Sequence, residues 1–143
     1  MTDAGAATPP GWYPDPAQPG AQRWWDGTAW GEQHVPLKMC TTSDLAGHRV
    51  DQVLGICVGL VANSMGFGKS FSASVQSMAQ GEVPQCTEAL ERGRQVAIHR
   101  LEEHAKSLGA NAVLALRLEA SELTPGLVEF VAYGTAAVVS PLT

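Results

Sequence analysis

The alternation of hydrophobic and polar residues after position 37 predicts a long first strand at about Val50 to Ala62. Four apolar residues fall on one of its faces at a period of two: Leu54, Ile56, Val58 and Leu60. The opposite face carries Cys57 between Gly55 and Gly59. Because glycine inside a strand often marks the close approach of another backbone, we expect a helix or a neighbouring subunit to press against this face.

Two helices are expected after this strand. The shorter one covers about Lys69 to Ala79, where apolar residues recur at helical spacing: Phe71, Val75 and Met78. The longer one runs from about Thr87 to Leu108, with Thr87 as its N-cap and Gly109 just past its end. Glu102 and Lys106 are spaced as a pair on its surface. Its core face comprises Leu90, Ala97, Leu101, Ala105 and Leu108.

Two further strands complete the pattern. Asn111–Glu119 places three leucines on one face: Leu114, Leu116 and Leu118. Residues 121–126 form a turn around Pro125-Gly126, and the last strand covers Leu127–Val139. The element order of residues 37–143 is therefore β-α-α-β-β. This order predicts an α+β fold with a small antiparallel sheet, one short helix and one long helix.

Residues 9–36 differ from the rest of the chain, because they hold six of its nine prolines and all four of its tryptophans. Such proline density excludes a long helix. Turn residues at Pro14-Asp15-Pro16 and at Asp26-Gly27 predict two or three short strands, including Gln22–Trp25 and Thr28–Glu32. We therefore expect three parts: a disordered tail at 1–8, a Trp-rich β mini-domain at 9–36 and an α+β domain at 37–143.

The tryptophans of the mini-domain have two interpretations. Small Trp-rich modules provide docking surfaces for peptides, which would make the four rings a partner-binding set: Trp12, Trp24, Trp25 and Trp30. The same rings are also the natural core, because so small a unit has little else to bury. We expect most of the rings to form the core, with room for one exposed ring.

Bulk composition narrows the classes of function. The 143 residues are 45% hydrophobic and 16% charged, as in a folded soluble protein, and the net charge of −5 argues against nucleic-acid binding. No apolar run reaches the roughly 18 residues of a membrane helix, and the N-terminus lacks the features of a secretory signal. The three cysteines, Cys40, Cys57 and Cys86, are an odd number without CxxC spacing, so we expect a reducing cytoplasm.

The sequence NSMGFGKS, residues 63–70, has features of a phosphate-binding loop, because it joins a strand to a helix and ends in Gly-Lys-Ser. The full pattern requires glycine at the position of Asn63. The later strands neither end in Asp nor alternate with crossover helices. We therefore favour a plain turn over a nucleotide-binding enzyme. A weak anion site would draw on Asn63, Gly66, Gly68, Lys69 and Ser70.

The N-terminal pattern WYPDP…PG…RWWDG…W resembles a short actinobacterial module of unknown function. The matching residues are Trp12 to Pro16, Pro19-Gly20, Arg23 to Gly27, and Trp30. Such modules are appended to unrelated domains or membrane segments. The resemblance therefore implies little about what the module does.

Residues 38–140 resemble the YbjQ-like family, whose name refers to heavy-metal binding. The most specific piece is AKSLGANAV, Ala105 to Val113, which is similar to the family's helix-to-strand turn A-x-x-x-G-A-N-A-V. Further matches are Thr41-Thr42, Leu45-Ala46-Gly47, Val53-Leu54-Gly55, Gly59, Phe71 and Tyr133 to Val138. The resemblance implies an α+β subunit assembled as a ring-shaped homopentamer, without known enzymatic activity.

Candidate metal ligands are few. His99 and Glu103 lie four residues apart on the long helix, with His104 beside them, and could hold a divalent metal ion. A solvated helix face carries the same residue types by default. Cys40 and His48 form no ligand pattern, and His34 is expected at the surface. Cys57 is expected to be a small buried hydrophobe rather than a nucleophile.

These observations favour a non-enzymatic, cytoplasmic homo-oligomer that binds a metal ion or small ligand at its subunit interfaces. The first alternative is an interaction adaptor, in which the ring multiplies weak contacts of the Trp-rich modules with a protein partner. The second is a nucleotide-binding enzyme that uses Lys69 and Ser70. No membrane or nucleic-acid partner is expected.

Overall fold

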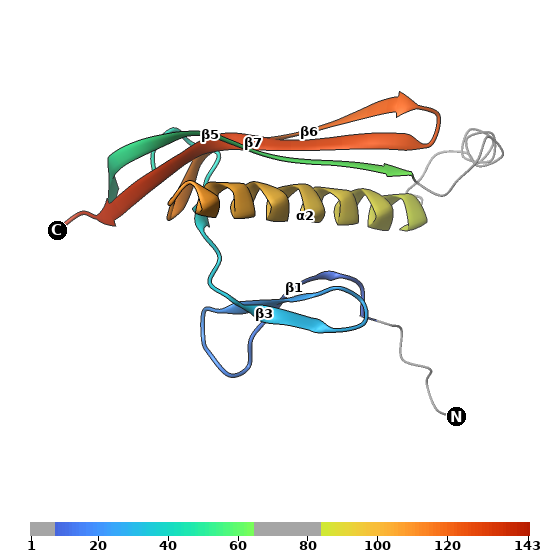
Figure 1. Cartoon of the computed structure of the whole chain (residues 1–143), viewed down its shortest axis with the longest axis horizontal. Helices are drawn as coiled ribbons and strands as arrows, with labels where there is room; N and C mark the ends of the chain where they lie inside the picture. The colour runs from blue at the N-terminus through green and yellow to red at the C-terminus, as the bar shows by residue number, and fades with distance from the viewer. Residues whose placement is uncertain (1–7, 65–83) are drawn as a thin grey trace. The chain divides into compact units, whose positions relative to one another are not determined.

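The computed structural model of the chain describes residues 8–64 and 84–143 (Figure 1). The chain divides into two compact units, with the boundary between Pro36 and Leu37. The expected short helix at Lys69–Ala79 lies outside the described residues. Below, unit 1 is the part that precedes Leu37 and unit 2 is Leu37–Thr143.

Unit 1 contains a three-stranded antiparallel sheet in the order β1-β2-β3. Its strands are β1 (Gly11–Pro14), β2 (Gln22–Trp25) and β3 (Trp30–His34). β3 begins two residues later than predicted, because Asp26 organises the preceding turn by accepting hydrogen bonds from Thr28 and Ala29. The prediction that His34 lies at the surface was wrong, since its ring is buried and stacks 4.3 Å from that of Trp12.

Unit 2 contains a four-stranded sheet in the order β4-β6-β7-β5, with one long helix on one face (Figure 1). The strands are β4 (Lys38–Met39), β5 (His48–Ser64), β6 (Ala112–Thr124) and β7 (Leu127–Pro141). β7 pairs antiparallel with both β5 and β6, as expected for the long strands. The sheet is nevertheless mixed, because the short β4, which the sequence pattern did not reveal, pairs parallel with β6.

Helix α2 (Pro84–Ser107) begins earlier than predicted. Thr87 is therefore not its N-cap, and Pro84 occupies the first helical position, where a missing N–H costs nothing. Gly109 ends the helix as expected, with a φ of 89° and its N–H donated to the Lys106 carbonyl. Leu108 was wrongly placed in the core, since it falls beyond the last turn and is exposed.

The main core lies between α2 and the sheet. Its buried centre includes Ala97, Leu101 and Ala105 from the helix and Cys57 and Phe130 from the strands. Small residues on α2 let the helix approach β5 so closely that a Cβ at Gly59 would overlap the Ala97 carbonyl oxygen and the Leu101 amide nitrogen. The predicted close approach at Gly59 is thus confirmed, and the partner is the chain's own helix.

A bulge removes Leu54 from the apolar face predicted for β5. The register with β7 shifts between Val53 and Gly55, and Gly55 adopts a φ of 124° with open space where a side chain would stand. Leu54 therefore packs against the main core, whereas Ile56, Val58 and Leu60 face away from it. The predicted alternation is correct for Ile56, Val58 and Leu60, whose shared face is exposed, and the opposite face meets the helix at Gly59 as expected.

A second bulge interrupts β6. Ala115 has a φ of 53°, and the register with β7 shifts between Leu114 and Arg117. Leu114 consequently packs into a small second core on the opposite face from Leu116, although the sequence placed both on one face. Gly134 stands across from this bulge, where a Cβ would come within 2.8 Å of the Val113 side chain and 3.0 Å of the Leu114 carbonyl. This crowding explains why position 134, within the family match at Tyr133 to Val138, is a glycine.

Candidate functional site

The exposed face of β5 carries a row of apolar side chains, here called the β5 row: Val53, Ile56, Val58 and Leu60. Ile56 is 73% exposed and Val53 is 63% exposed. A contiguous apolar surface of this kind on a soluble subunit generally marks an interaction site. β5 is also an edge strand of the sheet in the described part of the chain, so its outer N–H and C=O groups have no partner strand there.

Helix α2 satisfies two of these outer backbone groups. Arg100 donates from Nη1 to the Leu60 carbonyl at 2.7 Å, and the Val58 N–H donates to His104 Nδ1 at 3.0 Å. His104 therefore acts as an acceptor at Nδ1, which leaves Nε2 as the nitrogen that carries its proton or faces a ligand. No sequence pattern indicated Arg100, because its contact with Leu60 depends on how the helix lies along the strand.

Two of the three predicted metal ligands, His104 and Glu103, point to different surroundings. His104 faces β5, whereas Glu103 is exposed and approaches Lys106 at 3.7 Å. Among the residues described, no group of three or more His, Cys, Asp and Glu side chains gathers as a metal ion would require. The neighbouring Glu102 was expected on the surface of the helix, but it is buried. It is 2% exposed, accepts a hydrogen bond from the Leu37 N–H, and keeps its predicted partner Lys106 at 3.9 Å.

The candidate anion loop is described only at its start. Asn63 belongs to β5 and pairs with Val128 of β7. Gly66, Gly68, Lys69 and Ser70 lie outside the described residues. The antiparallel pairing of β6 with β7 agrees with the topology that argued against a phosphate-binding enzyme.

Motif residues of unit 2 meet around the β6 bulge. The carbonyls of Cys40 and Thr42 accept hydrogen bonds from the Leu116 and Ala115 N–H groups. Arg117 donates to the Thr41 carbonyl at 2.8 Å. The Thr41-Thr42 motif therefore satisfies backbone donors that the bulge removes from the β6–β7 ladder.

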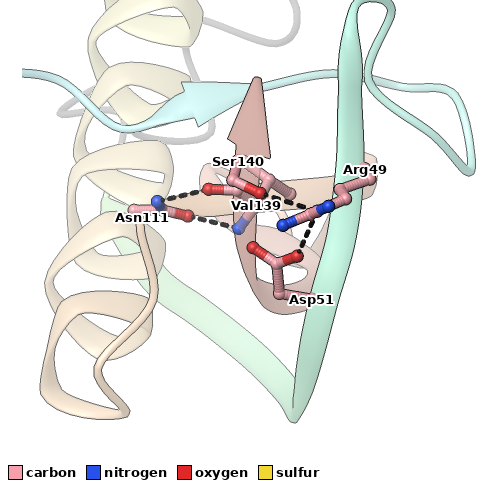
Figure 2. Close-up of polar contacts among 5 residues, drawn as sticks. All are labelled: Arg49, Asp51, Asn111, Val139 and Ser140. Atoms are coloured by element: carbon pink, nitrogen blue, oxygen red, sulfur yellow. Dashed lines mark hydrogen bonds and ion pairs between the residues drawn. The ribbon is translucent and has the colours of Figure 1, made fainter. Parts of the chain in front are cut away.

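Asn111 ties the helix-to-strand turn to the last strand (Figure 2). Its Nδ2 donates to the Val139 carbonyl at 2.9 Å, and its Oδ1 accepts from the Val139 N–H at 2.8 Å. In the same view, Arg49 bridges Asp51 and Ser140. The Ser140 hydroxyl and then Arg49 hold the pKa of Asp51 below its ordinary value. Both arrangements join segments that are distant in the sequence, so the Asn111 turn has a structural role.

The aromatic side chains of unit 1 fall into two groups. Trp12 and Trp24 meet edge to face with ring centroids 5.4 Å apart, next to the buried His34. Tyr13, Trp25 and Trp30 form the second group, in which Trp30 is half exposed. Alternation along the strands places the two groups on opposite faces of the sheet. The predicted docking set of four tryptophans is thus divided between the faces.

Residues 37–140 match the protein family described as "YbjQ_1: Putative heavy-metal-binding". The match spans nearly all of unit 2 and well over half of the chain. The chain belongs to the YbjQ-like family.

Similar proteins support this assignment. A UPF0145 protein of Bradyrhizobium sp. is 43% identical over 101 residues, which cover 71% of this chain and 91% of the relative. A UPF0145 protein of Methanoregula boonei is 42% identical over 103 residues, with 72% and 86% covered. Little of either relative lies outside the shared part. Unit 1 is an addition to this YbjQ-like core, and residues 10–39 match a separate family described as "Protein of unknown function (DUF2510)".

The residues described in this chain do not form the metal site that the family name would suggest. The donors described in this chain do not converge, and His104 Nδ1 is already engaged by the β5 backbone. Cys57 is fully buried, with its thiol donating to the Gly134 carbonyl, and burial raises the pKa of the thiol. It therefore behaves as a core residue rather than as a ligand or nucleophile.

Two further features bear on the setting of this YbjQ-like chain. Cys40, Cys57 and Cys86 are all free thiols. In the part of the chain that the structure describes, no helix combines the length and the apolar character that crossing a bilayer requires.

Proposed function

We propose that the chain is a non-enzymatic homo-oligomer whose subunits associate through β5 to form a closed ring, with five subunits as the family resemblance implies. The observation that carries the proposal is the β5 row on an edge strand of 17 residues. Proteins usually shorten, charge or cover such an edge, because it pairs readily with other chains.

The energetics favour a second copy that covers both the row and the edge. Full burial of one Val, Leu or Ile side chain contributes about 1.5–3 kcal/mol, so the row supplies on the order of 10 kcal/mol at most. Association costs about 4–15 kcal/mol in lost freedom. Apolar burial alone is therefore only just sufficient, and backbone pairing along the β5 edge adds what a stable interface needs.

A ring requires that two different surfaces meet. Beyond its short pairing with β4, the outer part of β6 is a second sheet edge among the described residues. If β5 of one subunit meets the β6 side of the next, the contact is heterologous, and repetition of such a contact closes a ring. In such a ring, the β5 edge and the β6 edge of each subunit are both covered by neighbouring subunits.

The oligomer is proposed to bind a metal ion or small ligand at its subunit interfaces. His99, Glu103 and His104 lie on the helix that runs beside β5, so each interface would bring together groups from two subunits. Support comes from the family description and from the absence of a three-ligand cluster within the described part of one subunit. The free thiols accord with a cytoplasmic setting.

The decisive test is the mass in solution. Light scattering after size exclusion should give about five times the subunit mass of 15.1 kDa for the wild type. Ile56→Glu should give monomers, because it places a charge in the centre of the row. Gln52→Glu, an exposed change on the same strand, should leave the ring intact. A wild type that is monomeric at all concentrations contradicts the proposal.

Metal binding is tested separately by calorimetric titration of the assembled wild type with Zn²⁺ in the absence of chelators. Binding should disappear in Ile56→Glu and weaken in His99→Ala. If the ring forms but takes up no Zn²⁺, assembly stands and the metal component of the proposal fails.

A second candidate function is that of an adaptor that docks a protein partner through unit 1. The observation that favours it is the half-exposed Trp30 beside Tyr13 and Trp25, since a purely structural core would cover these rings. A ring of five such modules would bind a multivalent partner with gain in avidity.

A further inference from the structure

The aromatic group of Tyr13, Trp25 and Trp30, here called the Tyr13 face, presents rings and hydrogen-bond donors on the same surface. The ring centroids of Trp25 and Trp30 are 4.9 Å apart, and those of Tyr13 and Trp30 are 5.7 Å apart at a nearly perpendicular angle. Trp30 is 50% exposed. The Tyr13 hydroxyl and the Trp25 indole N–H are the polar groups of this surface.

The chain's own Thr8-Pro9-Pro10 segment binds to these two donors. The Trp25 Nε1–H donates to the Thr8 carbonyl at 2.8 Å, and the Tyr13 hydroxyl donates to the Pro9 carbonyl at 2.7 Å. Pro10 lies next to Gly27, where a Cβ would touch its ring at 3.5 Å. Two successive carbonyls are thus recognised by two aromatic donors.

The chemistry of that segment is specific. Both accepting carbonyls belong to residues that precede a proline, and a following proline restricts a residue to the extended or polyproline II region. A polyproline II segment makes no internal hydrogen bonds, so its carbonyls remain available to donors. Aromatic grooves that bind proline-rich peptides exploit these two properties.

We propose that the Tyr13 face is a binding site for a proline-rich, polyproline II segment of a partner protein, and that Thr8-Pro9-Pro10 is an internal occupant which the partner displaces. The internal segment shows what the site accepts: carbonyls that precede proline, and proline rings beside aromatic side chains. The inference specifies the ligand class of the adaptor role and does not depend on ring formation. It assigns to Tyr13 a role in peptide binding, which the pattern of tryptophans did not indicate.

Tryptophan fluorescence provides a selective assay, because all four tryptophans of the chain lie in unit 1. The probe is a synthetic peptide that repeats the chain's own Ala-Thr-Pro-Pro sequence, and the control peptide has alanine in place of each proline. The full-length wild type should respond saturably to the first peptide and not to the second.

Single donor deletions locate the site. Tyr13→Phe and Trp25→Phe each keep a ring and remove one donor. Because the same donors hold the internal segment, they are tested in the Pro9→Ala/Pro10→Ala background, where each should weaken peptide binding about three- to tenfold. Trp24→Phe is the matched control, since it is the same substitution one residue away on the opposite face, and it should leave the affinity unchanged. Thermal unfolding of each variant establishes that the module is folded. Equal affinities for all three variants would refute the assignment.

Displacement is tested by loosening the internal segment. The double substitution Pro9→Ala with Pro10→Ala should increase the affinity for the added peptide roughly several-fold, because a competing tethered ligand is weakened. If neither this variant nor the wild type binds the peptide, the Tyr13 face is only the core of the module and the inference fails. Light scattering on the same samples reports ring assembly independently, so failure of docking is distinguishable from failure of the proposed oligomer.

Discussion

At the scale of single residues, the space and the hydrogen-bond partners around a position explain which residue type occupies it in several motifs. Gly59 is glycine because α2 crosses β5 at that point, and Gly134 is glycine because the β6 bulge crowds it. Asn111 occupies its position because an amide side chain offers both a donor and an acceptor to Val139. Each of these residues secures the contact between two segments.

Gly59→Ala should destabilise unit 2 by about 1–3 kcal/mol or more, because the new methyl group meets backbone atoms of α2 rather than a movable side chain. Chemical denaturation followed by far-UV circular dichroism measures the loss. Gln52→Ala, an exposed change on the same strand, should stay within about 0.5 kcal/mol of the wild type. An unchanged midpoint for Gly59→Ala would mean that helix and strand are not in close contact.

Asp15 makes unit 1 sensitive to acid. The Ala17 N–H and then Arg23 hold the pKa of its carboxyl below the ordinary value of 3.8. A carboxyl with a lowered pKa in the folded state stabilises above its ordinary pKa, and this contribution is lost as pH falls toward the lower folded value. Unfolding of unit 1 should therefore become easier below about pH 3.8, as monitored by tryptophan fluorescence. Asp15→Asn should flatten this dependence, whereas Glu32→Gln should not.

At the scale of elements, two bulges decide which faces of the long strands are buried. The β5 bulge at Gly55 turns three apolar side chains away from the core, and the β6 bulge at Ala115 separates Leu114 from Leu116. Since side chains alternate at a period of two, one extra residue is enough to exchange the faces beyond it. The segment Cys40–Thr42 then satisfies the amides that the β6 bulge exposes.

Ala115→Gly tests the β6 bulge. A non-glycine residue at positive φ carries a conformational cost, so glycine should stabilise unit 2 by up to about 1 kcal/mol at this position. The same change at Ala120, an exposed residue in the regular part of β6, should instead destabilise it by about 0.5–1 kcal/mol. If both substitutions lower the unfolding midpoint equally, Ala115 does not adopt the positive φ.

At the scale of the whole molecule, the chain joins a small aromatic module to a domain that matches the YbjQ-like family. The boundary between Pro36 and Leu37 coincides with the start of the match to the YbjQ-like family at residue 37. Little of the Bradyrhizobium and Methanoregula proteins lies outside that shared part. Folding and assembly are therefore expected to reside in unit 2, and peptide docking in unit 1.

A chain truncated to Leu37–Thr143 should fold with an unfolding midpoint close to that of unit 2 in the full chain, because Glu102 still accepts the Leu37 N–H and the core is intact. Light scattering should give the same number of subunits as for the full chain. Leu37→Pro in the full chain provides a contrast, since it removes that N–H and should destabilise unit 2 by about 1–3 kcal/mol. A truncated chain that fails to fold would show that unit 1 is required for folding.

The sequence by itself determined the long elements and the family. Periodicity located the long helix and the three long strands, proline and tryptophan clustering separated unit 1, and the GANAV turn pointed to the YbjQ-like family. These features are local, because each depends on residues within a few turns or a single strand of one another.

Only the tertiary structure decided which residues face which surface. The exposure of Ile56, the buried state of Glu102 and His34, and the contact of Arg100 with Leu60 all depend on segments distant in sequence. The same holds for the capture of Thr8-Pro9-Pro10 by Tyr13 and Trp25. Local patterns state how side chains alternate, but a bulge, a crossing helix or a returning segment determines which face is covered, and that choice is a long-range property of packing.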